Sequence, residues 1–255
     1  MAAPVLLEVC VDSVESAIAS EQGGAQRIEL CSNLAEGGVT PSAGMIAMTR
    51  KRIAVAVHVL IRPRAGDFRY SADEFEVMKR DILLAKQLGA HGVVLGLLDA
   101  EAEAKVDISR TRELVTLARP MTVTFNRAFD ATSDLQVALE DVISTGTDRI
   151  LTSGGAPTVE QGADALARLQ QAARGRIGII AAGSIREHNV RSILKKTGVR
   201  EIHAALQTPI PLPALPLGRA NLLESSAAGS QRHIVVRETV AALLAAANAA
   251  LQRGI

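Results

Sequence analysis

The stretch LLEVCVDSVESAIASEQGGAQRIELC, residues 6–31, predicts a strand, a helix and a second strand. Its two ends repeat one pattern, Leu7-Glu8-Val9-Cys10 and Ile28-Glu29-Leu30-Cys31, 21 positions apart. Each pattern belongs to a short apolar run that is typical of a β-strand. Two strands joined by a helix are expected to lie parallel and side by side, which would bring two carboxylates and two thiols close together.

The same alternation of short β-branched runs and longer helical stretches continues along the chain. Eight strands and eight helices in strict order favour a parallel sheet with right-handed crossovers. In 255 residues this number favours one closed TIM-type (β/α)8 barrel, an α/β fold, and we expect residues 1–255 to form a single domain. We expect strands at 6–10, 27–31, 54–62, 92–97, 121–126, 149–152, 177–181 and 201–203. We expect helices at 13–23, 41–51, 72–88, 107–118, 134–145, 160–173, 187–197 and 234–251.

Composition excludes several classes of protein. The formal net charge is +1 and there is no Trp and one Tyr, so neither a nucleic-acid partner nor an anionic membrane surface is expected. The N-terminus has no signal-peptide pattern, and no apolar stretch approaches the roughly 20 residues needed to span a bilayer. We therefore expect a cytoplasmic protein, in which two cysteines are free thiols, metal ligands or buried apolar residues rather than a disulfide scaffold.

The segment at about 207–230 departs from the alternation. It contains four prolines within eight positions and then a stretch of small polar residues. We expect a long loop there, either a disordered connector or a lid over the mouth of the barrel.

Strand alternation predicts which side chains face into the barrel. The outward set is apolar, because it packs against helices, and the inward set is polar. Buried carboxylates need cationic partners, and Arg62 is the inward-facing candidate to neutralise Glu8 and Glu29. The alternative is that such a network only fills the core. The inward polar residues are Glu8, Cys10, Glu29, Cys31, His58, Arg62, Thr122, Thr124, Asn126 and His203.

Cys10 and Cys31, the only cysteines, end neighbouring strands in this arrangement. Strands lie about 4.8 Å apart, so two thiolates at one level could share one ion. A pair of sulfurs suits Cu(I) better than structural zinc, which would need two further ligands. His203, on the strand expected next to the first, is the best-placed histidine. The alternative is that both cysteines are buried small hydrophobic residues.

Other polar groups follow the strands at the same edge and suit a small anionic ligand. Arg62 and Arg64 flank a proline and could hold a carboxylate or phosphate, or form a salt-bridged loop with Asp67. Later strands end in Gly-rich turns, where barrels commonly bind phosphate. The remaining ligand-binding candidates are Asn126, Arg127, Asp130, Ser153, Gly183 and His203.

Five stretches together resemble the CutC family of copper homeostasis proteins. They are LEVCVDSVESA (7–17), GGAQRIELCSNLAEGGVTPS (23–42), IRPRAGDFRYS (61–71), TFNRAFD (124–130) and LTSGG (151–155). The resemblance implies a TIM-type barrel, Cu(I) carried by Cys10 and Cys31, and self-association. Three departures from the family pattern stand out. Asn126 replaces a usual His, and Ala65 replaces a usual Gly. After His203, a usual Ser or Cys and a later polar segment are replaced by Ala204, Ala205 and the Pro-rich run.

Two functional hypotheses follow. In the first, a cytoplasmic protein of copper homeostasis binds Cu(I) through Cys10 and Cys31, with no organic cofactor. In the second, an enzyme, a lyase or isomerase, acts on a small carboxylated or phosphorylated compound. Its catalytic candidates are Glu8 or Glu29 as general base and Arg62, with Arg64 and Arg127, as the anion clamp.

Overall fold

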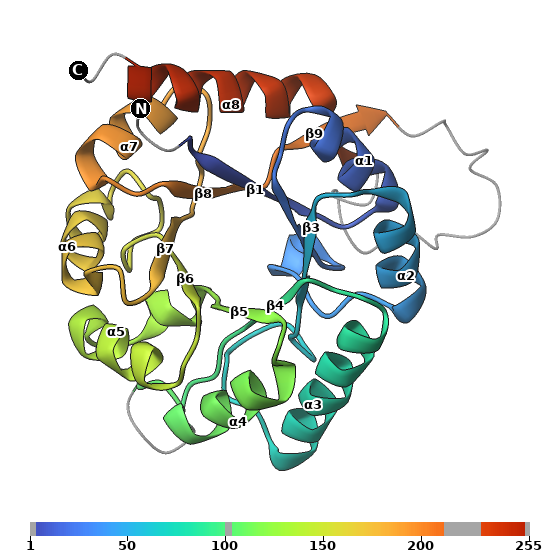
Figure 1. The fold of residues 1–255 in the computed structure, drawn as a ribbon, viewed down its shortest axis with the longest axis vertical. Coiled ribbons are helices and arrows are strands. Elements are labelled where there is room, and N and C mark those ends of the chain that lie inside the picture. Colours follow the sequence, from blue (N-terminus) through green and yellow to red (C-terminus); the bar gives the residue numbers. More distant parts are fainter. Residues whose placement is uncertain (1–3, 100–103, 212–230, 253–255) are drawn as a thin grey trace.

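Eight parallel strands close into one barrel, and each strand is followed by a helix that packs on the outside (Figure 1). The computed structural model describes residues 4–99, 104–211 and 231–252. The barrel strands are β1 Leu6–Val11, β2 Arg27–Leu30, β3 Ala56–Leu60, β4 Gly92–Leu95, β5 Thr122–Phe125, β6 Arg149–Thr152, β7 Gly178–Ala181 and β8 Glu201–Ala204. The order β1 to β8 is sequential, and β8 pairs with β1 to close the ring. The predicted TIM-type barrel is confirmed.

The helices surround the barrel in chain order. They are α1 Val14–Gln22, α2 Ala43–Arg52, α3 Ala72–Gln87, α4 Ile108–Ala118, α5 Leu135–Ser144, α6 Ala163–Ala173, α7 Val190–Thr197 and α8 Arg237–Gln252, with 3-10 turns η1 Leu34–Glu36 and η2 Arg127–Ala131. Several begin where a serine oxygen accepts a backbone N–H, as Ser13 does for α1 and Ser71 does for α3. Among the described helices, none is long and apolar enough to cross a membrane.

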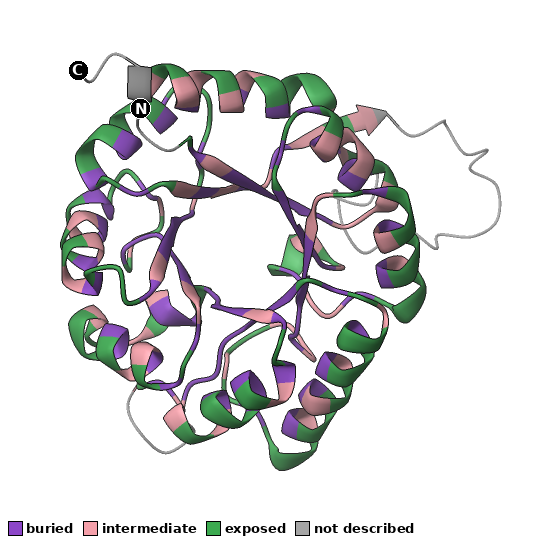
Figure 2. Ribbon diagram, viewed as in Figure 1, coloured by how far each residue is buried: buried purple, intermediate pink, exposed green. Residues whose placement is uncertain are grey.

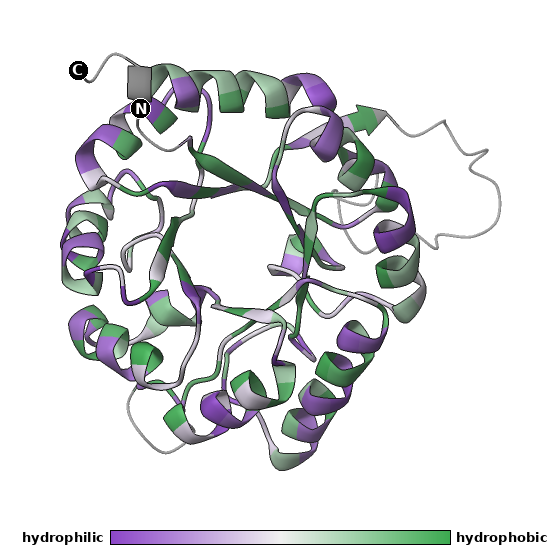
Figure 3. Cartoon of the chain, in the orientation of Figure 1, coloured by the Kyte–Doolittle hydropathy of each residue, from purple (hydrophilic) through white to green (hydrophobic). Residues whose placement is uncertain are grey.

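The core lies between strands and helices. Leu7, Val9, Ile28 and Leu30 are fully buried on the outer face of the barrel, as the alternation predicts. The strands and the inner sides of the helices are buried, while the outer sides of the helices are exposed (Figure 2). Most helices carry hydrophilic residues, whereas α8 is largely hydrophobic along its length (Figure 3).

The observed bounds of the expected elements lie within three residues of the expected ones, and two differences have a visible cause. The strand expected at 54–62 is shorter, because the N–H of Arg62 donates to Thr40 Oγ1 at 2.9 Å instead of continuing the ladder. The loop expected from 207 begins as a strand: β9 Gln207–Pro211 pairs antiparallel with β10 Gln231–Val235. A two-stranded ribbon has only edge strands, where proline is tolerated, so Pro209 does not prevent pairing. Residues 212–230 of the expected loop lie outside the described residues.

Candidate functional site

Three neighbouring strands supply the polar side chains at the centre of the barrel. In the pairing of β1 with β2, Glu8 lies opposite Arg27 and Cys10 opposite Glu29. In the pairing of β1 with β8, Glu8 lies opposite His203. Inward residues of adjacent parallel strands therefore form layers, with Glu8 one layer below Cys10.

The deeper layer is a charge network. Arg27 forms ion pairs with Glu8 and, at 2.6 Å, with Glu201. Arg149 contacts the same Glu201 carboxylate at 3.2 Å. Burial alone would raise the pKa of Glu8, but Arg27 and the hydrogen bond with His203 outweigh it and hold the pKa well below its usual range. The two carboxylates and the two guanidinium groups balance in charge.

This network corrects the expectation that Arg62 neutralises Glu8 and Glu29. The cation beside Glu8 is Arg27, whereas Arg62 donates to the backbone carbonyls of Glu36, Gly38 and Gly66 at 2.7–3.1 Å. Strand alternation alone places Arg27 on the inward side with Glu29, so the sequence held a signal for it. What the sequence lacked was the register that puts Arg27 level with Glu8.

Above the network, the two sulfur atoms meet. Cys10 Sγ lies 3.6 Å from Cys31 Sγ, and both side chains are buried. The contact with the Cys31 sulfur, burial and the nearby Glu29 carboxyl all raise the pKa of the Cys10 thiol well above its usual value. A metal–thiolate bond is about 2.3 Å long, so a single ion could reach both sulfurs at this separation.

Glu29 and His203 lie beside the sulfur of Cys10. One ligand atom from each of Cys10, Glu29 and His203 falls within 4.8 Å of the other two. His203 Nδ1 is 2.7 Å from Glu8 Oε1, and its Nε2 is 3.6 Å from Glu29 Oε2. Burial raises the pKa of Glu29, and the adjacent Glu8 acts in the same direction. The donor set of sulfur, imidazole and carboxylate fits a transition-metal ion.

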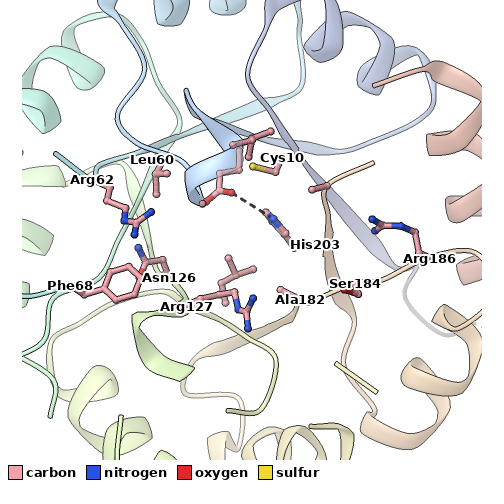
Figure 4. Close-up of a pocket in the computed structure, with 16 residues that line it drawn as sticks. Cys10, Leu60, Arg62, Phe68, Asn126, Arg127, Ala182, Ser184, Arg186 and His203 are labelled. Carbon is pink, nitrogen blue, oxygen red and sulfur yellow. Dashed lines mark ion pairs between the residues drawn. The ribbon is translucent and has the colours of Figure 1, made fainter. Parts of the chain in front are cut away.

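A cavity of about 550 Å³ opens above these groups (Figure 4). Cys10, Glu29 and His203 contribute to its lining, while Cys31 is completely buried and is not among the lining residues. The other lining residues come from the carboxyl-terminal parts of strands and from the loops that follow them, as expected for the carboxyl end of a barrel. These are Leu34, Gly37, Leu60, Arg62, Phe68, Asn126, Arg127, Leu151, Ala182, Gly183, Ser184, Arg186 and Ala205.

Asn126 follows β5, and the space for its side chain is left by Gly96, which follows the neighbouring strand β4. A Cβ at Gly96 would lie 2.0 Å from Asn126 Oδ1, so only glycine leaves room for the amide. Asn126 Oδ1 accepts the Ala128 N–H at 2.9 Å, which fixes the orientation of the side chain. The sequence signalled the asparagine but not the glycine beside it.

The other predicted ligand-binding residues divide into two groups. Arg127 and Gly183 line the cavity. Two of the other candidates hold Arg127 in place: its Nε donates to Asp130 Oδ2 at 2.8 Å, and its Nη2 donates to Ser153 Oγ at 2.7 Å. Arg64 and Asp67 lie outside the cavity lining and pair with each other at 3.0 Å, which is the salt-bridged loop of the alternative interpretation. Arg186 lines the cavity and was not predicted, because nothing in a single sequence distinguishes it from the arginines of the outer surface.

Comparison with known proteins identifies the family. The family model described as "CutC family" matches residues 5–208. This chain belongs to the CutC family. A CutC family protein of Chromobacterium violaceum is 49% identical over 200 residues, which cover 78% of this chain and 80% of that protein. A human relative described as a copper homeostasis protein cutC homolog is 45% identical over 203 residues, covering 80% of this chain and 74% of the relative.

Solved structures agree with the fold. The crystal structure of CutC from Streptococcus agalactiae superposes with a TM-score of 0.73 at 30% identity, covering 78% of this chain and 97% of that one. A thiamine phosphate pyrophosphorylase from Pyrococcus furiosus superposes with a TM-score of 0.59 at 19% identity and shows the barrel fold alone. Membership of the CutC family connects the chain with copper homeostasis.

Proposed function

We propose that this protein binds Cu(I) through Cys10 and Cys31 and acts in copper homeostasis in the cytoplasm. The observation that carries the proposal is the separation of 3.6 Å between the two sulfurs, next to an open cavity. Thiolates prefer soft ions such as Cu(I). Both cysteines are free thiols, which suits a reducing compartment. The name of the human relative, a copper homeostasis protein homolog, supports the same role.

His203 is the side chain that would assist the two sulfurs. Its Nδ1 faces the Glu8 carboxylate at 2.7 Å, which leaves Nε2 on the side of Glu29 and the cavity. A carboxylate behind an imidazole fixes the ring and its tautomer, as is usual for histidines that bind metals. Arg27 in turn holds Glu8 in its ionised form.

Anaerobic competition against the Cu(I) chelator bicinchoninate tests the proposal. The wild type should bind one Cu(I), and the Cys10→Ser/Cys31→Ser variant should bind at least about a hundredfold more weakly, because hydroxyl oxygen is a poor ligand for a soft ion. His203→Gln should weaken binding by about tenfold if the imidazole assists. Circular dichroism checks that each variant is folded. Equal Cu(I) affinity of the wild type and the double variant would refute the sulfur site.

A further inference from the structure

Arg62 is a buried cation without a neutralising carboxylate. Its side chain is 6% exposed and lines the cavity. Within the described part of the chain, no carboxylate oxygen lies within 4.0 Å of its guanidinium group, and Nε has no hydrogen-bond partner. The three carbonyl oxygens and the ring of Phe68, 4.9 Å away, hold the group in place without supplying a negative charge.

Burial of a charged group without an opposite charge is unfavourable, because the group loses its hydration and gains no ion pair in return. Arg27, the other buried arginine among the described residues, differs from Arg62 because it has two carboxylate partners. The missing negative charge at Arg62 therefore points to a ligand in the cavity.

A second unpaired arginine lines the same cavity. The Arg186 guanidinium group donates only to the carbonyl of Ile185, and none of the ion pairs among the described residues includes it. Arg127 also lines the cavity, but Asp130 balances its charge. The guanidinium groups of Arg62, Arg127 and Arg186 lie on different sides of the space (Figure 4). Among the lining residues only Glu29 carries a carboxylate, so arginines outnumber carboxylates three to one.

Neutral donors accompany these charges. The Oδ1 atom of Asn126 is occupied by the Ala128 N–H, which leaves its NH2 group as a donor on a residue that lines the cavity. The Ser184 hydroxyl adds another polar group beside Arg186. Donors around a concave space of about 550 Å³ match the size and chemistry of a site for a small organic molecule, and one metal ion would leave most of that volume empty.

We propose that the cavity binds a small organic polyanion, a dicarboxylate or a phosphorylated carboxylic acid, with its acidic groups at Arg62 and Arg186. Guanidinium groups bind carboxylates and phosphates in the same bidentate geometry, so the shared chemistry is an organic molecule with two acidic groups. Two separated arginines select two separated acidic groups over a simple monoanion. The proposal does not depend on copper, because the hydrogen bonds of the two sulfur atoms go to each other and to the carbonyl of Val11, and not to either arginine.

Thermal unfolding and isothermal titration of the full metal-free chain test this, with malate, 2-phosphoglycolate and acetate as probes at constant ionic strength. Malate or 2-phosphoglycolate should raise the melting temperature by several degrees at millimolar concentration, and acetate should not. Malate alone would identify a dicarboxylate site, and 2-phosphoglycolate alone a site for a phosphorylated acid.

The decisive variant is Arg186→Gln, because Arg186 is exposed and its replacement should leave the unliganded melting temperature unchanged. It should weaken binding of the active probe by at least tenfold. Arg191→Gln is the matched control, since Arg191 is also exposed but lies outside the cavity lining, and it should bind like the wild type. Arg62→Lys should also weaken binding if it folds. Absence of binding by both polyanions, or equal binding by the Arg186→Gln and Arg191→Gln variants, would overturn the inference.

Discussion

Replacing Arg27 with Met should lower the free energy of unfolding by about 3–5 kcal/mol. Arg27 is 3% exposed and Glu8 is completely buried, so the substitution leaves the Glu8 carboxylate without its main cation in a site that water does not reach. Glu201 loses one of its two arginines at the same time. Urea unfolding followed by circular dichroism at neutral pH measures the change.

An exposed ion pair of the same residue types provides the matched control. Arg176 contacts Glu140 through two hydrogen bonds of 2.7 Å, but both side chains are largely open to solvent. Arg176→Met should therefore reduce stability by no more than about 1 kcal/mol. Equal losses in the Arg27→Met and Arg176→Met variants would show that the buried network is not a main source of stability.

A second substitution separates loss of packing from the unpaired charge. Adding Glu8→Gln to the Arg27→Met variant should recover part of the lost stability, because the neutral amide does not need a cation. The Glu8→Gln substitution is also measured alone, in the wild-type background. If it lowers the free energy of unfolding by the same amount in the wild type and in the Arg27→Met variant, the two residues act independently.

The barrel and the sulfur pair could be predicted from the sequence because both depend on local periodicity. Alternation in 6–10 and 27–31 gives the inward positions of Cys10 and Cys31, and a helix between two strands gives their adjacency. The structure accordingly places the sulfurs 3.6 Å apart. The position of His203 near the first strand follows from closure of the barrel between β8 and β1.

Features that depend on register or on unusual backbone conformation could not be predicted. The pairing of Arg27 with Glu8 requires the relative shift of two strands, which alternation does not specify. Arg186 comes shortly after a turn in which Gly183 and Ser184 have positive φ angles, +100° and +63°. A serine in this region is uncommon, so its type carries no signal of that turn. The prolines of β9 predicted a loop because a short two-stranded ribbon has no strong sequence pattern.

Acidification should destabilise the protein through His58, and this pH dependence should disappear in a His58→Gln variant. Burial lowers the pKa of His58 to about 4, and Arg27 and Arg149 act in the same direction while Glu8 opposes them. The His58 ring packs against Gly92, so closely that a Cβ on this glycine would lie 2.7 Å from the ring. Its Nε2 is 3.2 Å from Thr122 Oγ1, and its Nδ1 is buried without a hydrogen-bond partner. The loss of hydration on burial therefore outweighs the attraction of Glu8 for an imidazolium.

The sign follows from proton uptake. Between the ordinary pKa of 6.5 and the folded value of about 4, the unfolded chain binds a proton at His58 that the folded protein does not. Stability is therefore complete above pH 6.5 and falls as the pH is lowered toward 4. From pH 7 to about pH 4.5 this one residue should remove about 2 kcal/mol of unfolding free energy. Urea unfolding at both pH values measures this loss of unfolding free energy. The wild type and the control variant His188→Gln, which changes an exposed histidine, should lose the same amount. The His58→Gln variant should lose about 2 kcal/mol less. The same pH dependence in all three proteins would mean that His58 accepts its proton in the folded state as readily as in the unfolded chain.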